Sequence, residues 1–262
     1  MQASAYNGVF GALTQQRRLD LIANNLANVN TTGFKREHAS FKDVFARYAH
    51  DYINPNQEVE DAVPWFKQYL IAKPRVNGNH VVFEQGSLRQ TDNPLDLALE
   101  GEGFFKVRSP KGEFYTRGGM FRRNDEGTVV DQNGNELLVD GAPLRLPTEG
   151  RVQIGPDGSV LVNEEPVGTI DVVNIKEPGA LEKIGGNLYR VNEKWRNQAG
   201  LEEFRPQGTN VSQGFLEMAN VEIVSEMVNM IDTLRIFEAC QKVVSSTQET
   251  DQRLMNKVGN GN

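Results

Sequence analysis

The residue types that most often carry out chemistry are few in this sequence and lie far apart. The three histidines, His38, His50 and His80, occupy different segments, and none has a partner at metal-ligand spacing. The one cysteine, Cys240, cannot form an internal disulfide, and its place in an apolar helical pattern favours a buried thiol over a nucleophile. Carboxylates are plentiful, but sequence alone does not separate a catalytic pair from a solvated surface. We therefore expect no enzyme active site, no metal site and no cofactor site.

Two short segments are similar to ligand-binding loops but lack decisive residues. Gly101–Phe104 begins like a nucleotide-binding loop, yet the third glycine and the following helix are missing, so a tight turn is favoured. Asp131–Glu136 is rich in calcium-ligand residue types, but its glycine comes too early for an EF-hand, so we interpret the segment as a hairpin loop. Asn30–Thr32 and Asn210–Ser212 match the glycosylation acceptor pattern, which often occurs by chance and is discounted here.

The composition limits the classes of partner. The chain has 262 residues, a formal net charge of −7 and a pI near 5.2, and it has no basic block longer than Arg17–Arg18 or Lys35–Arg36. A general nucleic-acid-binding protein needs a basic face to neutralise phosphates, so nucleic acid is not an expected partner. No apolar run reaches the roughly 18 residues that a membrane span requires. The N-terminal residues do not resemble a cleaved signal peptide, so we expect any export to use another route.

The C-terminal segment carries the clearest structural pattern. Asn220 is a suitable N-cap, and a helix from there to about residue 257 would be roughly 56 Å long. Its apolar residues recur every three or four positions, which is typical of a face that packs against another helix. These residues are Val224, Met227, Ile231, Leu234, Phe237, Cys240, Val244, Leu254 and Val258.

The N-terminal segment shows the same spacing. A helix over about residues 3–28 would be roughly 40 Å long, and it would end before Thr31-Thr32-Gly33. Its apolar face contains Val9, Ala12, Leu19, Ile22, Leu26 and Val29. Asn24, Asn25 and Asn28 flank this face, where an amide could either fix the register between two helices or cap the helix end. Two such faces predict helices that pair with each other, and with copies of the chain, in a coiled-coil-like manner.

Residues 37–75 are expected to connect the first helix to a β-rich region. Ser40-Phe41-Lys42-Asp43 matches a capping box and predicts a short amphipathic helix. Its expected apolar face is formed by Phe41, Val44, Phe45 and Tyr48. From about Tyr52 to Val76 an irregular, packed segment is expected, because prolines prevent a long helix. The prolines are Pro55, Pro64 and Pro74, and the proposed anchors are Trp65, Phe66, Tyr69 and Leu70.

Residues 76–211 show the pattern of an all-β unit, in which short apolar or β-branched runs alternate with glycine turns. The expected strands lie at 80–83, 104–107, 114–116, 128–130, 159–162 and 170–175. Turn residues stand at 110–112, 125–127, 133–134 and 156–158. No alternation of strands with helices is present, so a parallel sheet is not expected. The expected fold class is α+β, with paired terminal helices around a central, mainly antiparallel all-β domain.

Three sequence blocks resemble one protein family. Ala23–Arg36 (ANNLANVNTTGFKR) closely resembles the N-terminal signature of the bacterial flagellar rod and hook proteins. Gly86–Phe105, followed by Tyr115–Phe121, resembles the start of the β domain in that family. Gln213–Val221 and Glu226–Ile231 resemble the entry to its C-terminal helix. The blocks occur in the family's order and span the chain.

The resemblance implies a structural role. The length suits a rod protein rather than a hook protein, and Leu234–Glu238 looks more like a proximal than a distal rod subunit, although the N-terminal signature is as full as in the distal one. Such a subunit is expected to travel unfolded through the flagellar export apparatus. It is then expected to join copies of itself and related rod subunits in the periplasm-spanning rod of the basal body, the axial drive shaft that transmits torque. No small-molecule substrate is implied.

The family organisation can be mapped onto this chain. Residues 1–36 and 212–262 would form the inner, axial domain, residues 37–75 the connector and residues 76–211 the outer β domain. The residues expected at the assembly interface are Asn24, Asn25, Leu26, Asn28, Thr32, Gly33, Phe34, Val224, Met227, Ile231, Leu234 and Phe237. Two other classes stay open on the residues alone: a ligand-binding or enzymatic β module, and a coiled-coil adaptor that forms a discrete oligomer.

Overall fold

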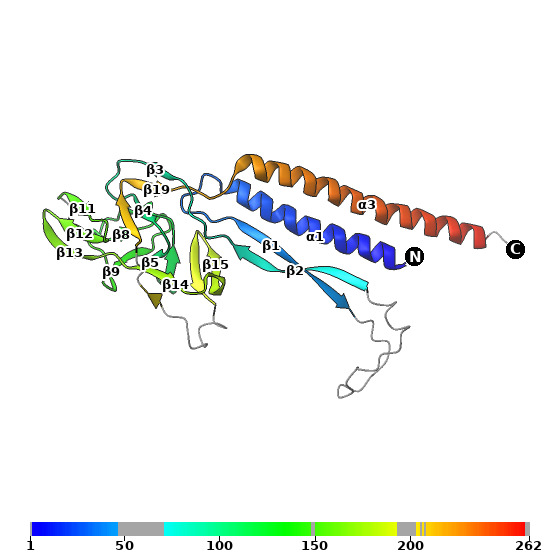
Figure 1. Cartoon of the computed structure of the whole chain (residues 1–262), viewed down its shortest axis with the longest axis horizontal. Coiled ribbons are helices and arrows are strands. Elements are labelled where there is room, and N and C mark those ends of the chain that lie inside the picture. Colours follow the sequence, from blue (N-terminus) through cyan, green and yellow to red (C-terminus); the bar gives the residue numbers. More distant parts are fainter. Residues whose placement is uncertain are drawn as a thin grey trace, which may run out of the picture. The chain divides into compact units, whose positions relative to one another are not determined.

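A computed structural model describes residues 2–46, 71–147, 150–192, 203–204, 206 and 208–259 (Figure 1). The chain divides into two compact units. Unit 1 consists of residues 1–24, 37–80 and 224–262, and unit 2 consists of residues 25–36 and 81–223. Each unit therefore combines segments that are far apart in the sequence, and each is described on its own below.

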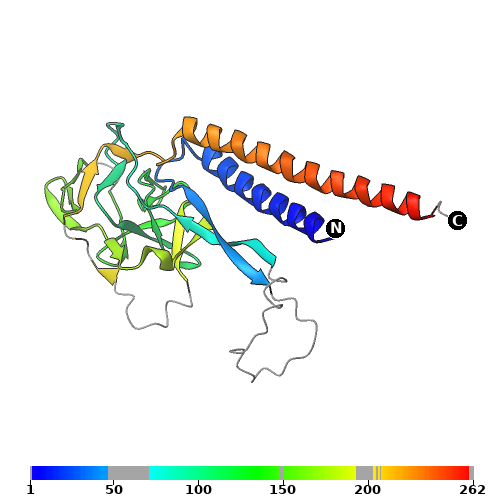
Figure 2. The same ribbon diagram turned by 45° about the vertical axis from the view of Figure 1, so that its right-hand side comes forward.

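Unit 1 is built on the two long helices that the sequence predicts. Helix α1 spans Gln2–Ala27 and helix α3 spans Ile223–Gly259. They run side by side in opposite directions (Figures 1 and 2). A Cβ atom on Gly8 would lie 2.8 Å from Cγ2 of Val244, and one on Gly11 would lie 3.0 Å from Sγ of Cys240. These glycines let the two helices approach closely, because a larger residue would meet the side chains of α3.

The side of α3 that contains Cys240 and Val244 is its less exposed side, here called the inward face. Its half-buried or buried residues recur every three or four positions, which is a coiled-coil spacing. They are Glu226, Met230, Thr233, Phe237, Cys240, Val244, Thr247 and Asp251. Several of these are polar, so the pattern of burial could not be read from hydrophobicity alone.

A second apolar stripe lies on the opposite side of α3. Its members are between 41% and 70% exposed, and we call them the outer stripe: Val224, Met227, Val228, Ile231 and Leu234. The expectation of one continuous apolar face from Val224 to Val258 was therefore wrong. The steps from Ile231 to Leu234, Phe237 and Cys240 are three residues each, and every such step turns about 60° back around the helix. Three such steps move the apolar positions by about 180°, from the outer stripe to the inward face of α3.

Unit 1 also contains a two-stranded sheet of β1 (Glu37–Ala46) and β2 (Ile71–Val81). The short helix expected around Ser40-Phe41-Lys42-Asp43 was wrong, and so was the irregular structure expected at 71–76. Local capping-box chemistry favoured a helix, whereas pairing with a distant strand decides the structure. Pro74 is tolerated because a strand in a two-stranded sheet has a free edge. The rest of the expected connector, residues 47–70, lies outside the described part of the chain.

Unit 2 contains most of the predicted β-rich region 76–211, and every strand pair among its described residues is antiparallel. Its first strands are β3 Leu88–Gln90, β4 Leu97–Glu100, β5 Phe104–Ser109, β6 Gly112–Thr116, β7 Arg122–Arg123, β8 Val129–Val130, β9 Glu136–Val139 and β10 Ala142–Pro143. They are followed by β11 Val152–Ile154, β12 Ser159–Val162, β13 Glu165–Thr169, β14 Val172–Ile175, the 3-10 turn η2 Pro178–Ala180, β15 Leu181–Gly185, β16 Leu188–Val191, β17 Glu203–Phe204, β18 Asn210–Gln213 and β19 Phe215–Glu217.

The largest sheet has ten strands, with the central order β15-β16-β6-β5-β9-β8-β7. Strands β11, β12 and β13 form a separate three-stranded sheet. The returning chain pairs with the first strands of the unit, β18 with β4 and β19 with β3. This pairing brings the segment before α3 next to residues that follow β2 in the sequence.

Strand β5 is buried on both of its faces, which explains the two core clusters. Phe105 and Val107 belong to the larger cluster, where the ring of Phe105 lies 5.6 Å from that of Phe121. Phe104 points to the opposite face, where its ring lies 5.3 Å from Phe83 and 5.8 Å from Tyr189. Adjacent residues of one strand thus enter different cores, as the alternation of a strand requires.

The two loops that resemble ligand sites are turns, as expected. Gly101 and Gly103 have φ angles of 117° and 119° between β4 and β5, a conformation that favours glycine. In the loop from β8 to β9, one carboxylate oxygen of Asp131 accepts hydrogen bonds from the backbone N–H groups of Asn133 and Asn135, each at 2.8 Å. The carboxylate therefore organises the hairpin loop.

Candidate assembly site

The segment that follows α1 is anchored in unit 2 by a tight turn. The backbone N–H of Thr31 donates to the carbonyl of Asn28 at 2.9 Å, and that of Phe34 donates to the carbonyl of Thr31 at 3.3 Å. The side chain of Asn187 donates to the carbonyl of Thr32 at 2.9 Å. The side-chain oxygen of Asn28 accepts a hydrogen bond from the Thr31 hydroxyl at 3.2 Å.

Gly33 occupies a place that no other residue type fits. Its backbone N–H donates to the carbonyl of Glu217 at 2.7 Å, and its φ is +67°. A Cβ atom at Gly33 would lie 2.4 Å from the carbonyl carbon of Arg117, well inside van der Waals contact. Both the backbone angle and the space therefore require glycine. The next residue, Phe34, is 1% exposed, and the Lys183 ammonium lies 4.0 Å from the centre of its ring.

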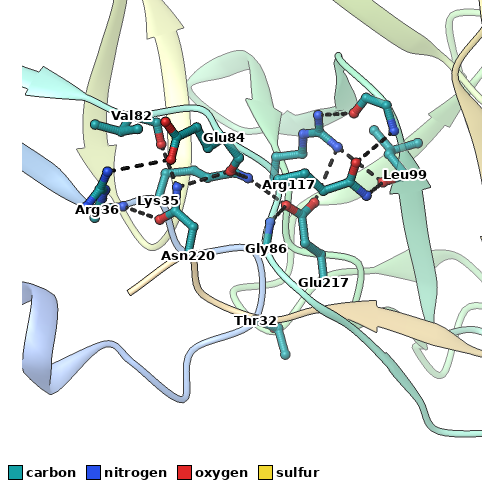
Figure 3. Close-up of polar contacts among 12 residues, drawn as sticks. Thr32, Lys35, Arg36, Val82, Glu84, Gly86, Leu99, Arg117, Glu217 and Asn220 are labelled. Carbon is teal, nitrogen blue, oxygen red and sulfur yellow. Dashed lines mark hydrogen bonds and ion pairs between the residues drawn. The ribbon is translucent and has the colours of Figure 1, made fainter. Parts of the chain in front are cut away.

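Next to Gly33 lies a buried charge cluster formed by Lys35, Arg117 and Glu217, here called the junction cluster (Figure 3). Nζ of Lys35 donates to Oε1 of Glu217 at 2.6 Å, and Nη1 of Arg117 donates to Oε2 at 3.3 Å. The backbone N–H of Gly86 also donates to Oε1, at 2.9 Å. One carboxylate thus receives hydrogen bonds from three parts of the chain.

The junction cluster holds two cations against one carboxylate. The side chains of Lys35 and Glu217 are fully buried. Burial lowers the pKa of Lys35, and the Glu217 carboxylate opposes that shift. The remaining positive charge is met by backbone oxygens, because Lys35 also donates to the carbonyl of Glu84 at 2.5 Å and Arg117 to that of Leu99 at 3.4 Å. These hydrogen bonds to carboxylate and backbone oxygens make such a buried cluster tolerable.

Asn220 ties the two ends of the junction together (Figure 3). Its side-chain oxygen accepts the backbone N–H of Arg36 at 2.7 Å, and its amide donates to the carbonyls of Val82 and Glu84 at 2.8 and 3.0 Å. The expected role of Asn220 as N-cap of the last helix was wrong, since α3 begins only at Ile223. The amide instead joins the segment after α1 to the segment before α3.

The described residues offer little for ligand chemistry. Among them no group of three His, Cys, Asp or Glu side chains is placed to hold a metal ion. An open groove of about 730 Å³ is lined in part by Arg123 and Gln213. Arg123 donates to the carbonyl of Pro147, and Gln213 donates to the carbonyls of Pro94 and Val152, so these side chains brace the groove walls. No helix in the described part of the chain is long and apolar enough to cross a membrane.

The sequence matches three models of flagellar proteins. Residues 6–35 match "Flagella basal body rod protein", residues 98–162 match "Flagellar hook protein FlgE/F/G D1 domain", and residues 212–257 match "Flagellar basal body rod FlgEFG protein C-terminal". The chain is 31% identical to the basal-body rod protein FlgG of Bacillus subtilis, over 98% of this chain and 99% of that protein. It is 33% identical to FlgF of Caulobacter vibrioides and 31% identical to FlgF of Mesorhizobium japonicum, over 99% of each chain.

The chain belongs to the flagellar basal-body rod protein family. The relatives named above are flagellar basal-body rod proteins. Relatives of the FlgF and FlgG types are equally similar, so identity alone does not separate these two members of the rod family. The resemblance that the three sequence blocks carried is therefore confirmed at the level of the family.

The structure places the expected interface residues of this rod protein in three settings. Gly33 and Phe34 are buried in the junction, and Thr32 is half-buried beside it. Asn25 is buried, Leu26 and Asn28 are half-buried, and Asn24 is exposed. On α3 the exposed residues are Val224, Met227, Ile231 and Leu234, whereas Phe237 belongs to the inward face.

Sequence reasoning missed the charged part of the junction. Lys35, Arg117 and Glu217 each lie inside or beside a family block, but a charged residue in a motif is usually solvent-exposed. The one available signal was that each of these charges lies within three residues of a glycine and an aromatic residue. That signal marks a possible packed site, yet it does not pair residues from different blocks.

Proposed function

We propose that this chain is a structural subunit of the bacterial flagellar rod, of the proximal, FlgF type, and that it polymerises through its terminal helices into the axial drive shaft. The observation that carries the proposal is the outer stripe of α3, which leaves large apolar side chains exposed in an isolated subunit. Surfaces of this kind are typical of protein interfaces. In a rod, neighbouring subunits would cover them.

Each face of α3 has its own role in this proposal. The inward face and α1 form a coiled-coil-like pair within the subunit, aided by the close approach at Gly8 and Gly11. The outer stripe contacts other subunits, and Asn24, which is exposed on α1, joins that interface. Contacts between different surfaces of identical or related subunits do not close on themselves, which is the symmetry that a rod requires.

The junction cluster has a supporting role in the proposal. It fixes Gly33–Arg36, which follows α1, to Glu217–Asn220, which precedes α3. The chain passes from α1 into the β region, and from the β region into α3, through these two segments. A buried crossing with many hydrogen bonds resists local unfolding better than exposed loops do. We assign residues 1–36 and 212–262 to the inner part of the rod and residues 76–211 to its outer part, joined by the connector 37–75.

The choice of FlgF over FlgG rests on the C-terminal helix. Leu234-Arg235-Ile236-Phe237-Glu238 looks like the proximal type, whereas the distal type typically has Gln-Arg-Ala-Tyr-Glu there. Phe237 lies on the inward face, where an exchange of Phe for Tyr would change the packing against α1. FlgG is the alternative. Export through the flagellar apparatus, as an unfolded chain, is part of the same proposal.

Gene replacement tests the proposal. The chain is expressed in two strains of a motile bacterium, one lacking FlgF and one lacking FlgG, and swimming and basal bodies are compared. Recovery of swimming only in the strain that lacks FlgF supports the assignment. Recovery only in the strain that lacks FlgG establishes the alternative, and absence of the chain from basal bodies in both strains contradicts a rod function.

A further inference from the structure

Strands β1 and β2 bring together two histidines that lie far apart in the sequence. The backbone N–H of Val82 donates to the carbonyl of Arg36 at 2.9 Å. Arg36 directly precedes β1 and Val82 directly follows β2, so the two strands are antiparallel, as Figures 1 and 2 show. In an antiparallel ladder such a bond joins residues that stand directly opposite each other, here Arg36 and Val82.

The register of the β1–β2 ribbon follows by counting from that pair. Glu37 is the first residue of β1 and Val81 the last of β2, so these two stand opposite each other, and His38 stands opposite His80. Side chains of directly opposite residues point to the same face, so both imidazoles lie on one face of the ribbon. At a position of this type the two Cα atoms are about 5.5 Å apart.

Both histidines are available to a ligand from solvent. Each is exposed, and neither imidazole has a hydrogen bond or an ion pair within the described part of the chain. Two neutral imidazoles this close can share one divalent transition-metal ion, since each ring nitrogen needs to approach Zn²⁺ to about 2.0–2.1 Å. The spacing along the sequence offers neither histidine a partner, whereas the strand pairing does.

The other groups near this face permit a bound cation. Ser40 lies two residues beyond His38 and is uncharged, and Glu37 points to the opposite face. Arg36, two residues before His38, is positive, but its guanidinium lies 3.5 Å from the Glu84 carboxylate, which offsets the charge. The described residues supply no group of three metal-binding side chains, so water would fill the remaining coordination positions.

We propose that His38 and His80 bind one divalent transition-metal ion, of the Zn²⁺, Ni²⁺ or Cu²⁺ class, across the β1–β2 ribbon. Imidazole nitrogen is a ligand that suits all three ions. With two protein ligands the site is weaker than a structural zinc site, which has four. A bound ion ties β1 to β2 next to the end of the ribbon. The inference does not depend on the proposed function.

Calorimetric titration of the purified full-length chain with Ni²⁺ and with Zn²⁺ tests the site. The chain carries no polyhistidine tag, and Cys240→Ser in every sample removes the thiol as a competing ligand. One ion should bind per chain. His38→Gln and His80→Gln should each lower the affinity by about tenfold or more, because a single imidazole remains. The double variant should lose little beyond either single variant, because the two rings act as one site.

The third histidine provides a matched control. His50 lies outside the described part of the chain, and His50→Gln should bind the ions like the parent chain. Since His38 and His80 are exposed, urea unfolding without metal should be the same for both variants and the parent.

Modification by diethyl pyrocarbonate, located by mass spectrometry, gives a second readout. Zn²⁺ should protect His38 and His80 together and leave His50 reactive. No binding to the parent, equal affinity in the parent and the two single variants, or protection of only one of the two paired histidines would overturn the proposal. Because the readout is metal binding, these results leave the rod function to its own gene-replacement test.

Discussion

Lys35 and Glu217 form an ion pair of 2.6 Å in which both side chains are fully buried, although 182 residues separate them in the sequence. Lys35 stands eight residues after α1, and Glu217 stands six residues before α3. The pair therefore joins the segments that lead to the two helices. The Glu217 carboxylate also accepts hydrogen bonds from Gly86 and Arg117. Residues from all three family blocks therefore meet at this carboxylate.

Removing the Lys35 ammonium should destabilise unit 2 strongly. Lys35→Met leaves the buried Glu217 carboxylate with less compensation, and breaking a buried ion pair costs about 3 kcal/mol or more. The free energy of unfolding, measured by urea denaturation of the full chain, should fall by that amount. Arg36→Met is the control, because its ion pair with Glu84 is long, at 3.5 Å, and partly exposed. The free energy of unfolding of the control should fall by less than about 1 kcal/mol. Equal losses in the two variants would show that the buried ion pair stabilises the fold no more than the exposed one.

The stability contributed by Lys35 should rise with pH in the alkaline range. Burial lowers the pKa of Lys35 from its ordinary value of 10.5, so the unfolded chain binds more protons between the lowered value and 10.5. The free energy of unfolding of the wild-type chain minus that of Lys35→Met should therefore increase as the pH rises toward 10.5. Lys111→Met, at an exposed turn, corrects for general effects of alkali. A difference that shrinks with pH would mean that the carboxylate, and not burial, dominates the pKa of Lys35.

Gly33→Ala should be far more harmful than an alanine at another glycine with positive φ. The new Cβ would lie 2.4 Å from the backbone of Arg117, so the segment must move and the hydrogen bond to Glu217 is lost. We expect a loss of more than about 2 kcal/mol in the free energy of unfolding. Gly134→Ala has a similar φ of 84° but open space around the Cβ, and it should lose about 1 kcal/mol. Similar losses would attribute the need for Gly33 to the backbone angle alone.

A bulky residue at Gly8 should separate the helices while sparing unit 2. Even the Cβ of Gly8→Val would lie 2.8 Å from Val244, so α1 cannot keep its place beside α3. Limited proteolysis should cut α1 faster, whereas the urea unfolding of unit 2 should not change. Asn7→Val adds the same side chain at the neighbouring, exposed position of α1 and should behave like the wild type. An unchanged rate of cleavage in Gly8→Val would contradict the close packing of the two helices.

The helices were predictable because apolar residues recur every three or four positions over many turns. This pattern depends only on residues that are close in the sequence. The strands near Phe104, Phe114 and Ser159 were predictable from short β-branched or aromatic runs between glycine turns. Strand β1 was not, because the capping-box pattern at Ser40 fits a helix as well, and its partner β2 begins only at Ile71, far along the sequence.

Within the candidate site, only the turn glycine and the buried aromatic residue could be predicted from the sequence. Gly33 and Phe34 stand out in the sequence because a glycine after Thr-Thr marks a turn and an aromatic residue marks burial. The ion pair of Lys35 with Glu217 could not be predicted, because the sequence around each residue is compatible with an exposed surface charge. The residues of the outer stripe were predicted as part of one apolar face with Phe237 and Cys240, but steps of three residues gradually rotate a pattern around a helix.

The most direct test of the account is a pair of substitutions in the outer stripe, Met227→Asp and Ile231→Asp, introduced into the chain in a motile strain that lacks its own copy. Both side chains are about half exposed, so the fold of the subunit should survive, as urea unfolding of the purified chain would verify. Ser246→Asp is the control. The account predicts that both variants are exported but that rods, examined by electron microscopy of basal bodies, are missing, while the control forms them. Normal rods and swimming with both stripe variants would contradict it.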